Sequence, residues 1–230
     1  VAGGGLDNMT AANQRIAKTT DCIVVAPDFR LPPEHRYPVP LDDCFAAFKW
    51  TAGNAERLGG RADGIGVGGG CTGGNIATAI TLMARDAGGP QFAALYPWAP
   101  VFDLRCETRS MYENSGPGYT LSRDDCLFVY SQYLADWEQR FEPLASPILA
   151  PSLKGMPPTY IHVGEWDVLR DESIDFANRL RDAGVDVTIN VQPVESHGPT
   201  PWNAPAVERN LAAFLARTIG PKAPRRRRAA

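Results

Sequence analysis

Apolar positions along this chain follow two spacings that predict strands and helices in turn. Short apolar runs of strand length occupy residues 22–26, 64–68, 91–96, 159–163 and 185–191. Apolar positions at helical spacing occupy residues 11–18, 41–58, 75–85, 173–183 and 206–219. The β-branched run at 22–26 is typical of a buried parallel strand. Strands that alternate with helices predict an α/β fold, with a parallel sheet that carries helices on both faces.

Between residues 103 and 149 the pattern changes to scattered aromatic residues and several helical stretches without a clear strand. We interpret this segment as a helical insertion in one domain that spans residues 1–220. Tyr119, Phe128 and Trp137 are candidates for lining a binding pocket there, although packing in the core explains aromatic residues equally well. Residues 221–230 contain four consecutive arginines and predict a disordered basic tail.

The composition of the chain argues against several classes of protein. The 230 residues carry a net charge of −3 and no basic face, which argues against nucleic acid or an acidic membrane as a partner. No apolar run is long enough to span a bilayer. Five cysteines are widely spaced, without Cys-x-x-Cys pairs or histidines at metal-ligand spacing. These features predict reduced thiols, a cytoplasmic location and no metal or cofactor, and they leave the oligomeric state open.

One glycine-rich pentapeptide directly follows the apolar run at 64–68. Residues 69–73 read Gly-Gly-Cys-Thr-Gly, which has the form Gly-x-nucleophile-x-Gly with Cys71 at its centre. A sharp turn from strand to helix holds such a residue in a strained conformation over the end of a sheet, and it needs very small neighbours. Cys71 is therefore a candidate nucleophile. The alternative is a buried structural thiol in a tight turn.

A thiol nucleophile needs a base, and the chain offers three histidines. His197 follows the last predicted strand, at the edge of the sheet where α/β proteins bind ligands. His35 lies in a proline-rich loop far ahead of Cys71. His162 sits inside an apolar strand, where a buried histidine with satisfied hydrogen bonds is expected. His197 is therefore the best candidate for the base.

An acid should orient that base, and it is expected to follow the preceding strand. Asp167 occupies this place, and Asp171 and Glu165 are weaker candidates. The resulting chain order of nucleophile, acid and base is that of α/β-hydrolases.

Several separate motifs make the chain resemble a known family. Residues 28–38, 68–75, 146–151 and 164–171 are similar to segments of the hormone-sensitive-lipase-like esterases of the α/β-hydrolase superfamily. The resemblance runs in order from residue 2 to about residue 219. It implies an α/β-hydrolase fold with a mostly parallel sheet, from which the family's N-terminal cap and first strands are missing.

The resemblance also implies a reaction and its residues. It assigns the nucleophile to Cys71, the acid to Asp167, the base to His197, and the oxyanion-hole donors to Gly4, Gly5 and Thr72. The implied activity is hydrolysis of carboxylic esters or thioesters through a covalent acyl-enzyme. The implied partner is a small-molecule acyl ester, with no metal or cofactor.

This chain departs from the family pattern at several places. Ala2 stands where the glycine loop begins with histidine, Pro199 replaces a common aromatic, and Gly70, Cys71 and Thr72 replace Asp, Ser and Ala of the nucleophile motif. These departures motivate an alternative function, a non-catalytic small-molecule-binding protein or receptor on a degenerate hydrolase scaffold. An inactive fragment is a third interpretation.

Overall fold

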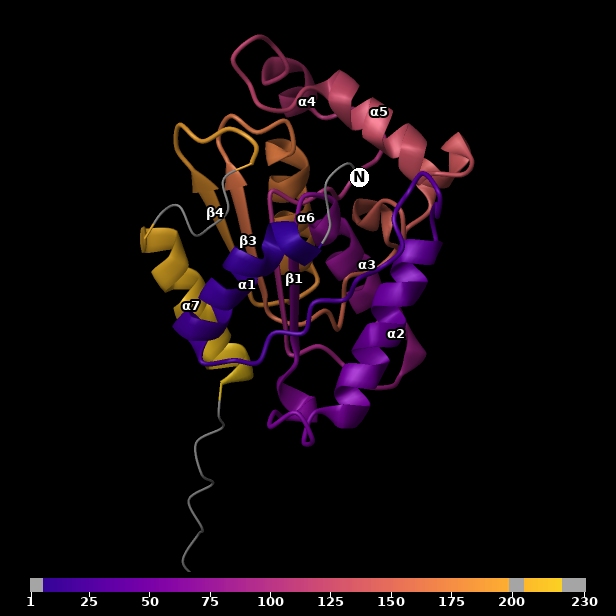
Figure 1. Ribbon diagram of the computed structural model, residues 1–230. Coiled ribbons are helices and arrows are strands. Elements are labelled where there is room, and N and C mark those ends of the chain that lie inside the picture. The colour runs from indigo at the N-terminus through magenta and orange to yellow at the C-terminus, as the bar shows by residue number, and fades with distance from the viewer. Residues whose placement is uncertain (1–5, 199–204, 221–230) are drawn as a thin grey trace, which may run out of the picture.

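A parallel sheet forms the centre of the structure, a computed structural model that describes residues 6–198 and 205–220. The strands lie side by side in chain order: β1 (Gly66–Gly70), β2 (Ala94–Trp98), β3 (Thr159–Gly164) and β4 (Val187–Gln192). Parallel strands end at the same edge of a sheet. The loops that follow β1, β3 and β4 therefore gather at one end of the molecule (Figure 1).

Helices cover both faces of this sheet (Figure 1). On one face, α1 (Leu6–Thr20) and α7 (Pro205–Ile219) pack on Ala94 and Tyr160. On the other, α3 (Thr72–Ala87) and α6 (Arg170–Asp182) pack on Leu95 and Ile161, and α2 (Val39–Asn54) packs on α3. Because neighbouring residues of a strand point to opposite faces, β2 and β3 each contribute to both cores. This is why their sequences are nearly continuous apolar runs.

The segment between β2 and β3 adds helical structure near the end of the sheet where the strands stop (Figure 1). It contains α4 (Arg109–Glu113), α5 (Arg123–Tyr133) and 3₁₀ turns at Trp137–Phe141 and Pro147–Leu149; a further 3₁₀ turn precedes β1 at Ala62–Gly64. Ser122 and Asp125 form a capping box that starts α5. Asn75 of α3 anchors the segment, because its amide donates to the carbonyl oxygens of Val101 (3.1 Å) and Ala145 (2.7 Å).

The fold class that the hydrophobic pattern predicts is confirmed, but one predicted strand is wrong. Residues 22–26 are extended and form no strand, and Ile23 and Val25 are 54% and 41% exposed. Cys22 and Val24 pack against the core under α1 and α7. The alternation is that of a strand, but β1 is the last strand on that side within the described residues. The segment does not pair with this edge strand, and an extended segment without ladder hydrogen bonds is not a strand.

The predicted boundaries of the domain are not tested by this structure. A single domain over residues 1–220 stays a prediction, and the basic residues 221–230 lie outside the described residues. Within the described ranges, no helix is both long and apolar enough to cross a bilayer.

Candidate active site

Cys71 sits in the turn that connects β1 to α3. Its φ and ψ are 52° and −119°, a conformation that residues other than glycine rarely adopt. Backbone hydrogen bonds hold it there: the Cys71 N–H donates to the Trp98 carbonyl (3.0 Å), and the Cys71 carbonyl accepts from Gly74 (3.0 Å) and Val101 (3.2 Å). Strain of about 1–3 kcal/mol is held at such positions only where the surroundings fix it. Cys71 is thus the strained central residue of the turn from β1 to α3, which is the conformation expected of a candidate nucleophile.

The glycines around Cys71 serve different purposes. A Cβ on Gly69 would lie 2.5 Å from backbone atoms of Gly73, so the turn requires glycine at position 69. A Cβ on Gly73 would meet nothing within 4 Å. At Gly70 a Cβ would lie 2.3 Å from Nε1 of Trp98. The Trp98 indole therefore fills the space that the aspartate of the esterase motif would need.

Asp167 and His197 follow neighbouring strands, and the structure brings them together. Asp167 lies after β3 and His197 after β4, and Nδ1 of His197 is 2.9 Å from Oδ2 of Asp167. The Asp167 side chain is fully buried, and its Oδ1 also accepts a hydrogen bond from the Leu169 N–H (2.9 Å). Because Asp167 occupies Nδ1, Nε2 is the ring nitrogen available to a nucleophile.

The surroundings of His197 favour its charged form. Burial lowers the pKa of this imidazole, but the Asp167 and Cys71 side chains outweigh burial and raise its pKa to about 10. The Cys71 side chain interacts with this ring. The three candidates, Cys71, His197 and Asp167, thus lie together at one edge of the sheet.

The other candidates for base and acid have structural partners instead. His162 is 2% exposed, with Nε2 3.1 Å from Oε1 of Glu195 and Nδ1 2.8 Å from Nδ2 of Asn190. This confirms the prediction of a satisfied core histidine. His35 is exposed in its loop.

The two weaker acid candidates support backbone groups. Asp171 accepts a hydrogen bond from the Ser110 N–H (2.8 Å), and Glu165 accepts one from the Val194 N–H (3.0 Å). Neither is the carboxylate that pairs with His197.

Only part of the predicted oxyanion hole can be described. Thr72 is the first residue of α3, and the first N–H groups of a helix have no acceptor within the helix. The positive end of the α3 dipole also favours negative charge at this point. Gly4 and Gly5 lie outside the described residues. Their role therefore stays a prediction.

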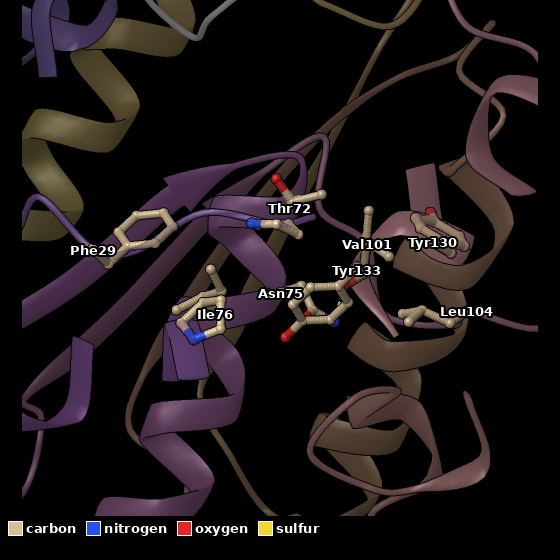
Figure 2. A pocket seen from close by; sticks show the side chains of 10 residues that line it. Phe29, Thr72, Asn75, Ile76, Val101, Leu104, Tyr130 and Tyr133 are labelled. Carbon is tan, nitrogen blue, oxygen red and sulfur yellow. Dashed lines mark hydrogen bonds between the residues drawn. The ribbon is translucent and has the colours of Figure 1, made fainter. Parts of the chain in front are cut away.

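An apolar pocket opens beside Thr72 (Figure 2). It is narrow, with a volume of about 10 Å³, which is room for about one water molecule. Its walls come from α3, from α5 and from the loops that follow residue 28 and β2: Phe29, Pro32, Pro40, Thr72, Asn75, Ile76, Val101, Leu104, Tyr130 and Tyr133.

None of the three aromatic residues that the sequence offers for an acyl pocket lines this one. Phe128 and Trp137 are 67% and 37% exposed, and neither they nor Tyr119 line it. Tyr130 and Tyr133 do, and their spacing of three residues on α5 is the signal that places both on one face.

Three of the remaining four thiols differ from Cys71 in burial. Cys44, Cys106 and Cys126 are buried, and burial raises the pKa of Cys44 and of Cys106 to about 12. The pKa of Cys126 is raised as well, again mainly by burial. At neutral pH these groups stay protonated and unreactive. Within the described residues, no group of three or more His, Cys, Asp and Glu side chains is arranged to hold a metal ion.

Glu172 is a fully buried carboxyl group that sequence reasoning missed. Its Oε1 accepts hydrogen bonds from the N–H groups of Phe102 (2.6 Å) and Asp103 (3.2 Å), which ties α6 to the loop after β2. Oε2 has no hydrogen-bond partner within the described residues. Burial raises the pKa of Glu172 well above its ordinary value, which favours the neutral acid.

We expect the Glu172→Gln variant to unfold at nearly the same urea concentration as the wild type. The amide carbonyl of glutamine can accept hydrogen bonds from both N–H groups, and the glutamine side chain is also neutral. Glu172→Leu fills the space but leaves two buried donors without an acceptor, at a cost of about 2–5 kcal/mol. Urea unfolding at neutral pH measures both. A glutamine variant as unstable as the leucine variant would contradict the inference that Glu172 is protonated in the folded protein.

The chain is similar to known proteins over most of its length. A family profile described as "alpha/beta hydrolase fold" matches residues 1–200. Carboxylesterase NlhH of Mycobacterium tuberculosis is 35% identical over 220 residues, which cover 92% of this chain and 69% of NlhH. An arylesterase of Saccharolobus solfataricus is 32% identical over 183 residues, covering 79% of this chain and 59% of that enzyme.

Solved structures agree with these relatives. EstE1, a thermophilic carboxylesterase cloned from a metagenomic library, superposes with a TM-score of 0.89 at 28% identity and covers 95% of this chain and 76% of its own. An arylesterase structure gives a TM-score of 0.86 at 29% identity, covering 94% and 72%. The chain therefore belongs to the α/β-hydrolase-fold family, within its hormone-sensitive-lipase-like branch, as a carboxylesterase-like hydrolase.

Proposed function

We propose that this protein hydrolyses carboxylic esters or thioesters of small molecules, with Cys71 as nucleophile, His197 as base and Asp167 as the acid that orients it. The observation that carries the proposal is the 2.9 Å contact between Asp167 and His197, with Cys71 in the elbow beside the imidazole. Unlike the buried His162–Glu195 pair, this pair lies beside the strained thiol of the turn, which is the arrangement that nucleophilic catalysis requires.

The reaction begins with a Cys71 thiolate held beside the His197 imidazolium. The thiolate attacks the carbonyl carbon, and the negative charge moves to the carbonyl oxygen, next to the Thr72 N–H and the N-terminus of α3. When the carbon–oxygen bond to the alcohol breaks, His197 gives its proton to the leaving oxygen. The product that remains on the enzyme is a thioester of Cys71.

Water completes the turnover. His197, now neutral, takes a proton from the attacking water, and the tetrahedral intermediate collapses to release the carboxylic acid and restore the Cys71 thiolate. Asp167 stabilises the imidazolium, which is present before the first step and forms again in the second. A thioester substrate follows the same path, with a thiol in place of the alcohol. The pocket beside Thr72 suits the acyl group, because its lining is mostly apolar.

The experiment that tests this proposal traps the intermediate. Purified protein is mixed with p-nitrophenyl esters of increasing acyl length, and acid-quenched samples are analysed by intact mass and peptide mapping. We expect a burst of p-nitrophenol and an acyl adduct on Cys71 that neutral hydroxylamine removes, as it does thioesters. Turnover with an adduct on another residue would contradict the assignment of Cys71.

A further inference from the structure

The chain between α4 and α5 touches the loop of the acid candidate. Asn114 ends α4 and is 5% exposed. Its Nδ2 donates a hydrogen bond to the backbone carbonyl of Asp167 (2.9 Å) and a longer one to that of Glu165 (3.4 Å). Ser110, one turn earlier on α4, donates to the carbonyl of Val168 (2.7 Å). The acid loop is therefore held by side chains of the insertion.

The same connection also touches the loop of the base candidate. The Thr120 hydroxyl donates a hydrogen bond to the backbone carbonyl of His197 itself. The Thr120 N–H donates to the Ser196 hydroxyl (3.2 Å), and the two hydroxyl oxygens are 3.0 Å apart. Asn114 and Thr120, which we call the α4–α5 clamp, thus contact the backbone of both residues of the pair.

Other contacts between the two loops lie upstream of His197. The Trp166 N–H donates to the Glu195 carbonyl (2.9 Å), and the Val194 N–H donates to Glu165 (3.0 Å). These bonds bring the loops together but do not reach the residue that carries the imidazole. Thr120 bonds to His197 directly, and the same α4–α5 connection holds Asp167 through Asn114.

We propose that Asn114 and Thr120 are positioning residues, which fix the backbones of Asp167 and His197 so that the imidazole stays aligned with Cys71. The inference rests on the proposed function. A shift of about 1 Å in such an alignment can lower a rate by as much as about a hundredfold, so we expect loss of the Thr120 hydroxyl to affect turnover.

The test compares three threonine variants. Thr120→Val removes the hydroxyl and keeps the shape, and Thr120→Ser restores it. Thr51→Val is the matched control, because the Thr51 hydroxyl also donates to a backbone carbonyl, that of Ala47, but within α2. We expect Thr120→Val to lower kcat for a p-nitrophenyl ester about tenfold with little change in KM. The serine variant and the Thr51 control should stay within about twofold of wild type.

A second readout does not depend on turnover. Alkylation of Cys71 by iodoacetamide at pH 7 reports the thiolate beside His197, and it should slow in Thr120→Val and in Asn114→Leu but not in Thr51→Val. The His197→Ala variant separates the two proposals. If His197→Ala alkylates and turns over like wild type, the proposed function is wrong. If His197→Ala is impaired while Thr120→Val matches the Thr51 control, the clamp is wrong and the proposed function stands.

Discussion

Replacing Cys71 with alanine should lower kcat/KM for p-nitrophenyl esters by at least about a thousandfold. The variant retains the pocket and the helix N-terminus but has no atom that can form the acyl-enzyme. Alanine has a Cβ like cysteine, so the φ of 52° costs about the same in both and the fold should persist. Circular dichroism and thermal melting verify that the variant is folded before its rates are compared.

The Cys71→Ser variant is the matched control for nucleophile chemistry. Serine keeps the elbow and the hydrogen-bonding capacity, but its proton must be removed during attack, whereas a thiolate attacks directly. We expect roughly 1–10% of wild-type kcat/KM, because sulfur and oxygen place the tetrahedral centre at different distances from the oxyanion donors. A serine variant faster than wild type would show a site shaped for oxygen. Full activity in the Cys71→Ala variant would contradict the assignment of Cys71 as the nucleophile.

Replacing Asp167 with asparagine should lower kcat by about a hundredfold or more, since the carboxylate that orients and charges His197 is lost. Burial, which lowers the pKa of His197, is then opposed by Cys71 alone, so the pKa falls from about 10. Alkylation of Cys71 measured from pH 5 to pH 10.5 should therefore be slower at neutral pH. Asp186→Asn is the control, because Asp186 pairs with Arg217 on the surface, away from the site.

Stability should change with pH in the same variant. The folded chain raises the pKa of His197 from 6.5 to about 10, so the protonated ring stabilises the fold fully below pH 6.5. That contribution is lost as the pH rises through about 10. The melting temperature of wild type should thus fall more between pH 6.5 and pH 10.5 than that of Asp167→Asn. Parallel curves for the two proteins would contradict a stabilising Asp167–His197 ion pair.

The sequence was sufficient to predict the fold, and it indicates for a physical reason which candidate residues lie at one edge of the sheet. Residues that follow parallel strands must meet at one edge, so Cys71, Asp167 and His197 can be brought together from strand order alone. The strand predicted at residues 22–26 is wrong because a strand forms only by pairing with another strand, and the local sequence does not show whether such pairing occurs.

Contacts made by the insertion could not be predicted. Thr120 and Asn114 bind backbone carbonyls, which every residue has, so their residue types carry no sign of a partner. Glu172 is similar: an acidic residue near the start of a helix is usually a surface residue that favours the helix dipole, and only the packing of the loop after β2 buries it.

The tight fit of Gly70 against Trp98 constrains how this site can evolve. An aspartate at position 70 would collide with the indole, and shortening Trp98 first would leave an empty space beside the nucleophile. The two positions therefore form a pair whose members are expected to change together. If one position changes before the other, the intermediate protein either has a clash between residue 70 and Trp98 or has a cavity where the indole was. Both are expected to lower stability, which favours keeping glycine at position 70.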